Sequence, residues 1–410
     1  MKQHNLIPHL FRTEFSKITA VLCKYLGVAH ITAAEDIASE TFLKALETWP
    51  YTGQPANPVG WLYAVARNKA KNHVQREKLF AEKIAPHLSE PATNAQENIL
   101  DLSDKNIADS QLQMLFTICH PCLSTEAQIG LALRILCGFG IDEIASALLS
   151  NKETINKRLL RAKGKLRREQ PAIALPPAAE INRRLSTVLR TLYLLYNEGY
   201  YSESNENILR EGLCMEAMRL TQQLIDNDLT NCPEVNGLMA LMCFQASRFA
   251  ARKSATGTMV LYNDQDTALW DQQLIARGAY YLRQASTGNT LSKYHIEATI
   301  AYWHTHKLDS EEKWQNILQL FDLLLITDYS IIAALNRIYA LAKVSGNQEA
   351  IQSALTLSLT DNQYYHTLLG ELFTGTDNAA ANAHFTKALL LAKTTHDKTI
   401  IRHKMERILA

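Results

Sequence analysis

Apolar residues recur at intervals of three and four along almost the whole chain, and this periodicity most limits the possible folds. An α-helix has about 3.6 residues per turn, so this spacing places apolar side chains on one helical face. No segment shows the sustained alternation of apolar and polar residues that a half-buried strand requires. With 410 residues, the chain can hold several domains with cores of their own. The sequence therefore predicts an all-α, multidomain protein.

Changes in composition divide the chain into segments. Residues 1–80 predict a compact helical bundle. Residues 81–118 are polar and acidic without a stable apolar stripe, so we expect a linker there. Residues 119–170 predict a smaller helical unit, after which the prolines of QPAIALPPAAE break any helix and indicate another boundary. Residues 181–410 predict a series of helical hairpins.

The sequence lacks the features of membrane-spanning proteins, secreted disulfide-linked proteins and several classes of enzyme. No stretch approaches the roughly eighteen uninterrupted apolar residues of a membrane span, and MKQHNLIPHLFRTEF has no apolar signal core. The 7 scattered cysteines fit a reducing compartment better than a disulfide framework. Gly-rich phosphate loops, G-x-S-x-G and H-E-x-x-H do not occur. We therefore expect a cytoplasmic protein without enzyme activity, metal or cofactor.

The basic segment ETINKRLLRAKGKLRRE indicates DNA binding. It follows IDEIASALL and a turn at SN, so a short helix, a brief turn and a longer basic helix succeed one another. This order is the helix-turn-helix pattern, whose second helix enters the major groove. Its inward stripe is formed by Ile155, Leu159, Ala162 and Leu166. The alternative is a charged helix face that only contacts solvent.

Outward residues in the N-terminal half of this basic helix are the candidates for reading bases. They are Asn156, Lys157, Leu160 and Arg161. The other cations suit phosphate contacts, which position a protein on DNA without specifying sequence. These are Arg158, Lys163, Lys165, Arg167 and Arg168.

The earlier segment TAAEDIASETFLKALETW predicts a helix with one acidic face. Thr32 and Glu35 fit a capping box that would start this helix. The exposed face carries Asp36, Glu40, Leu43 and Glu47, and the buried side carries Ile37, Ala38, Phe42, Ala45 and Trp49. Phosphate would repel such a face, so it suits a basic protein surface.

The next segment, WLYAVARNKAKNHVQREK, interleaves amides with cations. Its inner stripe is Leu62, Ala66, Ala70 and Val74, and its outer side carries Asn68, Lys71, Asn72 and Gln75 between Arg67, Lys69, Arg76 and Lys78. Such a surface suits single-stranded nucleic acid. A basic surface helix without a ligand is the alternative.

Taken in this order, the segments resemble an extracytoplasmic-function (ECF) sigma factor of bacterial RNA polymerase. AEDIASETFLKALETW and WLYAVARNKAKN resemble the family's domain 2, and LALRILCGFGIDEIASALLSNKETINKRLLRAKGKLR resembles its domain 4. The resemblance covers roughly residues 6–169. It implies binding to promoter DNA and to the beta-prime clamp and beta flap of core RNA polymerase.

The resemblance also implies roles for single residues. Asp36, Glu40, Leu43 and Glu47 would contact the polymerase, while Trp61, Arg67, Asn68, Lys69, Asn72 and Arg76 would hold the minus-10 strand, Asn68 near its flipped base and Trp61 bracing the loop. Thr154, Asn156, Lys157, Arg158, Leu160, Arg161, Lys163 and Lys165 would contact the minus-35 element. The turn SNKET lacks the family's usual glycine, and Asn156 stands where arginine is frequent. The preferred minus-35 sequence is therefore open.

The rear of the chain resembles the extension of an ECF subgroup with a tetratricopeptide-like C-terminal domain. The segments that carry this resemblance are LYLLYNEGYYSESNENILREGLCMEAMRLTQQL and LYNDQDTALWDQQLIARG. The tetratricopeptide spacing, short of one loop residue, is followed by Leu369, Gly370, Phe373, Ala381, Phe385 and Ala388. Stacked helical pairs of this kind form concave surfaces that bind other proteins. We expect a domain that regulates the front half, with a regulatory protein as a possible partner.

Three further groups of residues have two interpretations each, and one group of histidines has a single one. Cys119, His120 and Cys122 could be half of a zinc site, but semi-buried thiols beside a proline are favoured. Asp264, Asp266 and Asp271 could bind a metal, but capping of the helix bearing Trp270 by Asp264 or Asp266 is favoured. Asn197, Glu198, Tyr200 and Tyr201 could line a ligand pocket, although the end of a helix packed between domains is favoured. His295, His304 and His306 are expected on helix surfaces.

The competing function is that of a conventional helix-turn-helix regulator with a tetratricopeptide partner-binding domain. It predicts duplex binding without polymerase, and it leaves the acidic face and WLYAVARNKAKN unexplained.

Overall fold

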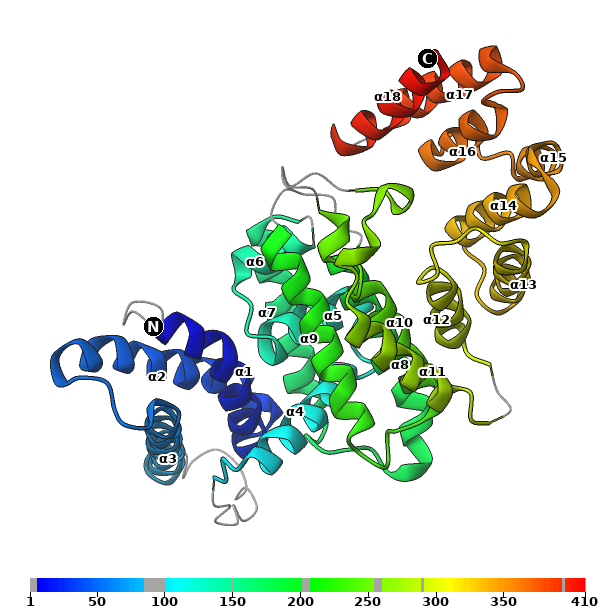
Figure 1. Ribbon diagram of the computed structural model, residues 1–410. Helices are drawn as coiled ribbons and strands as arrows, with labels where there is room; N and C mark the ends of the chain where they lie inside the picture. The colour runs from blue at the N-terminus through cyan, green and yellow to red at the C-terminus, as the bar shows by residue number, and fades with distance from the viewer. Residues whose placement is uncertain are drawn as a thin grey trace. The chain divides into compact units, whose positions relative to one another are not determined.

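The computed structural model describes residues 6–84, 100–148, 150–200, 207–253, 260–288, 291–392 and 395–409. Within these ranges the regular elements are helices, which confirms the all-α class (Figure 1). The chain divides into two compact units. Unit 1 comprises Met1–Tyr200 and Ile208–Asn231, and unit 2 comprises Tyr201–Asn207 and Cys232–Ala410. None of the described helices is long and apolar enough to cross a membrane.

Unit 1 begins with a bundle of three long helices. These are α1 (Leu6–Leu26), α2 (Ile31–Thr52) and α3 (Pro58–Ile84), with the short turn η2 (Val28–His30) between the first two. Both α2 and α3 pack on α1. The expected inner side of α2 is buried throughout, and so are three of the four residues expected on the inner side of α3, Val74 being half-buried.

The second part of unit 1 contains α4 (Asp104–Ile118), α5 (Thr125–Leu131), η3 (Ala132–Leu136), α6 (Ile141–Ala147) and α7 (Lys152–Glu169). The prediction of a linker over residues 81–118 is wrong at both ends. Helix α3 continues to Ile84, and the last part of the segment forms the regular helix α4. Ser103 caps α4, and Met114, Leu115 and Phe116 are fully buried. α4 packs directly on α1.

The boundary expected near residues 171–180 does not separate compact units. α8 (Ala178–Tyr200) and α9 (Asn207–Ile225) both belong to unit 1. Arg184 of α8 donates to the carbonyl oxygen of Phe116 at 2.6 Å. Arg219 of α9 donates to Gln111 Oε1 at 3.1 Å and to the carbonyl oxygen of Leu136 at 3.0 Å. The start of the predicted rear domain therefore completes the core of the front half.

Unit 2 is a succession of helices in which each packs on the next. They are α10 (Pro233–Ala246), α11 (Gln272–Ala285), α12 (Lys293–Trp303), α13 (Glu311–Thr327), α14 (Ile331–Ser345), α15 (Asn347–Leu357), α16 (Gln363–Phe373), α17 (Asn378–Leu391) and α18 (Thr395–Leu409). The short 3-10 helices η4 (Ala250–Arg252), η5 (Tyr262–Asp264) and η6 (Thr267–Leu269) lie between α10 and α11. Separate apolar clusters lie between helices α12 to α14, between α14 to α16 and between α17 and α18.

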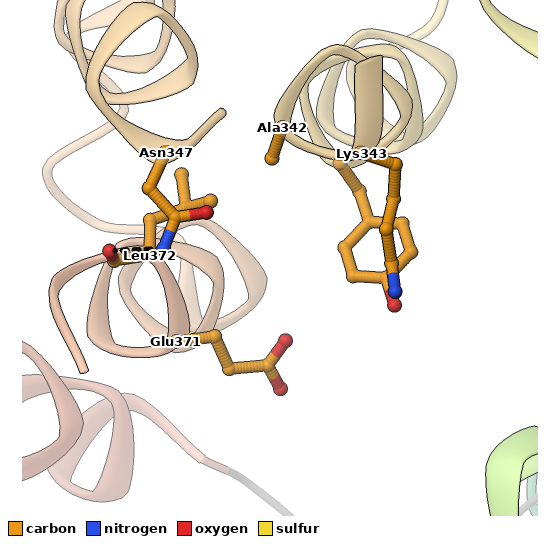
Figure 2. A pocket seen from close by; sticks show the side chains of 6 residues that line it. Ala342, Lys343, Asn347, Glu371 and Leu372 are labelled. Carbon is orange, nitrogen blue, oxygen red and sulfur yellow. Dashed lines mark hydrogen bonds between the residues drawn. The ribbon is translucent and has the colours of Figure 1, made fainter. Parts of the chain in front are cut away.

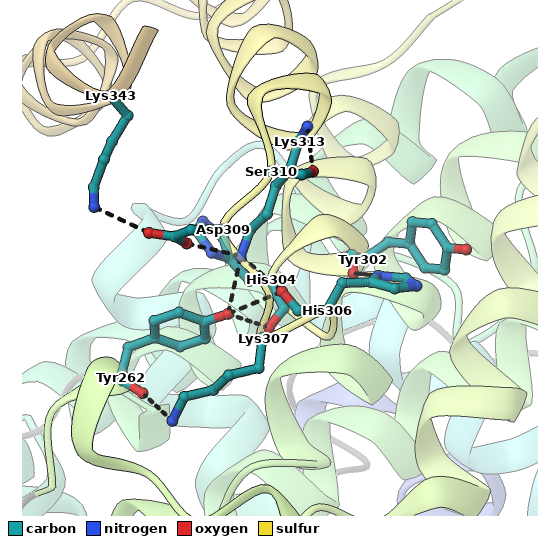
Figure 3. A network of polar contacts seen from close by, with 9 residues as sticks. All are labelled: Tyr262, Tyr302, His304, His306, Lys307, Asp309, Ser310, Lys313 and Lys343. Carbon is teal, nitrogen blue, oxygen red and sulfur yellow. Dashed lines mark hydrogen bonds and ion pairs between the residues drawn. The ribbon is translucent and has the colours of Figure 1, made fainter. Parts of the chain in front are cut away.

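A polar network ties η5 to α13 and α14 (Figure 3). Lys313 has an exposed fraction of only 1%, and its ammonium group donates to the carbonyl oxygen of His306 at 2.7 Å and to the hydroxyl of Tyr262 at 3.3 Å. Asp309 lies 3.6 Å from Lys313 and 3.0 Å from Lys343. A buried ammonium group is tolerated only when paired and hydrogen-bonded, and this network meets both conditions.

Candidate nucleic-acid and protein interfaces

The acidic face of α2 is exposed as a continuous row. Asp36, Glu40, Leu43 and Glu47 are all exposed, and Leu43 shows 53% of its surface. The apolar opposite side of α2 holds this row in place by packing into the bundle. An exposed leucine surrounded by carboxylates can contact a basic protein surface with an apolar centre.

The predicted start of α2 is wrong. His30 rather than Thr32 precedes the helix, and no side chain caps it. Glu35 is buried, with 4% of its surface exposed, and it points to the second part of unit 1 instead of back to the helix start.

On α3 the predicted nucleic-acid side also faces solvent. Arg67, Asn68, Asn72 and Arg76 are exposed. Trp61, in the first turn of α3, is half-buried and meets the ring of Trp49 edge-on at 5.4 Å. Asn57 accepts a hydrogen bond from the backbone of Gly60 at 2.9 Å, which fixes the start of α3.

A salt bridge links the two predicted surfaces. Lys69 of α3 donates to Glu40 of α2 at 2.5 Å, and 31% and 57% of their side chains are exposed. Because a solvent-exposed pair contributes little to stability, either residue can leave it for another partner. The acidic face and the amide-rich face are therefore neighbours on one bundle.

The long basic helix α7 has the orientation predicted from its periodicity. Asn151 caps it by accepting from the backbone of Thr154 at 2.7 Å, and the four residues of the expected inner stripe are buried. α6, a short turn and α7 follow one another as predicted. The outward residues Thr154, Asn156, Lys157, Leu160, Arg161 and Lys165 are exposed, and Arg158 is half-buried.

Lys163 differs from the other predicted phosphate contacts. Its ammonium group donates to one carboxylate oxygen of Glu35, and Arg134 donates to the other at 2.8 Å. Only 18% of the Lys163 side chain is exposed. In this arrangement Lys163 joins α7 to α2 and is not available to a phosphate.

A second contact holds the last turn of α7 on the first bundle. Arg167 donates to the backbone oxygen of Ala29 in η2 at 3.2 Å. The parts that resemble domains 2 and 4 therefore pack on one another within unit 1. Sequence reasoning missed Glu35 and Arg134, although Glu35 lies three and seven residues before the buried Ala38 and Phe42 and so shares their helical phase.

Comparisons with known proteins agree with this architecture. Residues 10–80 match the family model of sigma-70 region 2, and residues 184–286 match a family of unknown function, DUF6596. An uncharacterized protein of Rhizobium meliloti (strain 1021) is 31% identical over 386 residues, which are 93% of this chain and 91% of that protein. The chain belongs to the family of this rhizobial protein. No solved structure matches the chain.

Sigma-70 region 2 coincides with the three-helix bundle described above, since the match runs from α1 into α3. It supports a sigma-factor-like role in transcription initiation, with core RNA polymerase and promoter DNA as partners. The DUF6596 match covers α8 to α11 and so includes helices of both units.

The cysteine and aspartate groups that could have bound a metal contain residues with structural roles. Cys119 is buried and its thiol lies 3.6 Å from the hydroxyl of Thr191, and burial raises the pKa of this thiol to about 12. Asp266 caps η6 by accepting from Ala268 at 2.9 Å, and Asp271 caps α11. Capping is confirmed for Asp266, but it caps η6, which ends before Trp270, and the helix that follows Trp270 is capped by Asp271 instead of Asp264 or Asp266.

Two histidines expected on helix surfaces are enclosed. His295 is buried and its Nε2 lies 3.2 Å from the hydroxyl of Ser286. His304 is half-buried, and burial together with the charges of Arg248 and Lys313 lowers its pKa to about 3. His306 is exposed, as expected. Asn197, Glu198 and Tyr200 end α8 as expected, and Tyr201 lies outside the described residues.

A shallow cavity of about 250 Å³ lies between α14 and α16 (Figure 2). Its wall includes Lys343 and Glu371, which are paired with Asp309 and Lys404 respectively. Asn347 donates to the carbonyl oxygen of Leu372 at 3.0 Å across one side. Because its charged groups already have partners, the cavity does not indicate a ligand.

Proposed function

We propose that this chain is a sigma factor of the ECF type that directs core RNA polymerase to specific promoters. The match of residues 10–80 to sigma-70 region 2 carries the proposal. The chain itself performs no catalysis in this proposal, because the polymerase supplies the chemistry.

The exposed faces of unit 1 support a division of labour. The row from Asp36 to Glu47 contacts the polymerase clamp, and the neighbouring face of α3 holds the unpaired minus-10 strand, with Asn68 nearest to the flipped base. The helix pair α6–α7 reads the minus-35 element through Asn156, Lys157, Leu160 and Arg161. Two weak DNA contacts joined through one polymerase act together, since the second contact becomes intramolecular.

Unit 2 regulates this activity as a tetratricopeptide-like domain through protein contacts. Its stacked helical pairs support this role, and so does the close packing of Gly370 on the ring of Phe385, at positions of the repeat pattern. Ile326, Tyr329 and Ile332 at the α13–α14 turn are 84%, 65% and 52% exposed. Apolar side chains that gather at one exposed turn favour a protein partner.

In vitro transcription tests the proposal. Purified core polymerase, the full chain and a promoter library are expected to give specific initiation that core polymerase alone does not give. A chain ending at Asn231 retains every helix of unit 1 and shows whether unit 2 inhibits or assists. Duplex binding without any polymerase-dependent transcript, with either chain, would instead favour a conventional helix-turn-helix regulator.

A further inference from the structure

Three side chains with metal-binding atoms meet where η2 approaches α3. His30 is the last residue of η2, and His73 and Glu77 are four residues apart on α3, so they lie one turn apart on the same helical face. One ligand atom of each lies within 4.8 Å of the other two. We propose that His30, His73 and Glu77 bind one zinc ion.

Two of the three distances between the donor atoms fit a tetrahedral ion, and the third is within 4.8 Å. Zinc binds nitrogen and carboxylate oxygen at about 2.0–2.2 Å, so two ligand atoms of one tetrahedron lie about 3.3–3.6 Å apart. Glu77 Oε1 lies 3.4 Å from His30 Nδ1 and 3.3 Å from His73 Nε2. Both distances equal the edge of such a tetrahedron.

Simple hydrogen bonding explains these contacts less well. A charge-assisted bond from imidazole to carboxylate has a length of about 2.7–2.9 Å, shorter than either contact. Moreover, His73 Nε2 is shielded from solvent and has no hydrogen-bond partner, which is unfavourable for a polar atom. A shared ion satisfies this nitrogen and holds all three groups at the observed separations.

The ligand set favours a transition-metal ion. Two imidazoles and one carboxylate suit zinc, as they also suit ferrous iron, whereas calcium and magnesium prefer oxygen ligands alone. Tetrahedral spacing of the donor atoms favours zinc among these ions. The side chains of His30 and Glu77 are 37% and 49% exposed, so the ion can approach from their side, although His73 Nε2 itself is shielded. Water can then occupy the fourth position of the tetrahedron.

Zinc at this site would join η2 to α3 near the residues proposed to hold the minus-10 strand. Asn72 and Arg76 directly precede His73 and Glu77 in the chain, and Arg167 of α7 contacts η2 beside His30. The site stands independently of the proposed function, because zinc binding is measured on the free protein.

Titration of the metal-free full chain with zinc against a competing chromophoric chelator tests the proposal. We expect one equivalent to bind in the wild type, and binding to weaken at least about tenfold in His73→Ala and Glu77→Gln. His9→Ala is the matched control, since His9 is an exposed histidine on α1, and it should bind as the wild type does. Far-ultraviolet circular dichroism checks each fold, and Glu77→Gln changes only a partly exposed carboxylate.

Cobalt substitution separates this site from the 7 cysteines of the chain. A tetrahedral cobalt spectrum without a thiolate charge-transfer band, lost in Glu77→Gln, supports the proposal. Wild-type affinity in both His73→Ala and Glu77→Gln, or a thiolate band that survives them, would overturn it.

Discussion

Lys163 of the basic helix α7 and Arg134 of η3 hold the same buried carboxylate, that of Glu35 on α2. This triad connects the helix proposed to enter DNA with the helix proposed to contact the polymerase. In the proposed function Lys163 reaches a phosphate only after leaving Glu35. In that proposal, the free chain is therefore in a state that differs from the promoter-bound one.

Replacing Glu35 with Gln should loosen α7 from α2. The buried carboxylate is the shared acceptor of two cations, so its loss should cost about 2–3 kcal/mol of local stability. Hydrogen exchange followed by mass spectrometry should then show amides of α7 exchanging roughly 30- to 150-fold faster.

Glu47→Gln removes an exposed carboxylate from the same helix and is the control for this change. Equal exchange of α7 in Glu35→Gln and the wild type would show that the triad does not hold the helix.

Leu43→Ala should weaken binding to core polymerase. The leucine is 53% exposed and stands at the centre of the acidic row, where loss of an apolar anchor costs about 1–2 kcal/mol, or roughly tenfold in affinity. Stability of the free chain should change by less than about 0.5 kcal/mol, because the side chain is already in solvent. Affinity can be measured by fluorescence anisotropy with labelled protein.

Leu46→Ala is a matched control, as Leu46 is also 53% exposed on α2 but lies to one side of the row. An equal loss in both variants would contradict a contact centred on Leu43.

Arg161→Ala should reduce recognition of the minus-35 element. Arg161 is exposed on the outward side of α7, and loss of a base contact costs about 1–3 kcal/mol at one position of the site. Competition between promoter variants in polymerase-dependent initiation measures this effect. Arg168→Ala, in the last turn of α7, should weaken binding to all promoter variants equally. If Arg161→Ala gave the same uniform loss, Arg161 would not read a base.

Periodicity predicted the helices and their buried faces better than it predicted contacts between them. The inner stripes of α2 and α7 follow from spacing alone, since a helix fixes which residues share a face. The triad of Glu35, Arg134 and Lys163 depends on long-range packing that no local pattern contains. The spacing of Thr32 and Glu35 fits a capping box, but this local pattern does not show that Glu35 pairs with distant cations.

The composition of a long segment does not indicate a helix that occupies only part of it. The apolar residues of α4 stand at the end of a segment whose first part is polar and acidic, so the whole of 81–118 resembled a linker. The prolines after α7 do end a helix, but the chain then returns to pack α8 on α4 and α5. The three-ligand cluster of His30, His73 and Glu77 brings together residues 43 and 47 positions apart, which a search for local motifs does not detect.

Gly370→Ala should destabilise the α16–α17 pair. An added Cβ atom would lie 2.8 Å from the ring of Phe385, which is 1% exposed and cannot move without disturbing its neighbours. Overpacking of this kind costs about 1–3 kcal/mol, which exceeds the gain of roughly 1 kcal/mol in helix propensity. Faster hydrogen exchange in α16 and α17 is the expected result.

Gly164→Ala tests the same substitution where nothing lies within 4 Å of the added atom. It should stabilise α7 by up to about 1 kcal/mol. If Gly370→Ala also stabilised the chain, the ring of Phe385 would be able to move away from the added atom at little cost.

The stability of the chain should depend on pH through His304. Burial and the nearby cations lower its pKa from 6.5 to about 3, so between these values the unfolded chain binds a proton that the folded chain does not. The free energy of unfolding should therefore rise with pH across this window, by up to about 1.4 kcal/mol per pH unit for one proton. Above pH 6.5 His304 is neutral in both states and the free energy of unfolding no longer rises through it. As the pH falls from 6.5 towards 3, this stability is lost.

Urea denaturation at several pH values in this window, followed in unit 2 by hydrogen exchange, measures the dependence. His304→Gln removes the titrating group, so its unfolding free energy should vary less steeply with pH than that of the wild type. His306→Gln, two residues away and exposed, should keep the wild-type slope. If His304→Gln kept that slope too, the acid sensitivity of unit 2 would arise from other groups, such as His295 and His384, whose pKa values are also lowered by burial.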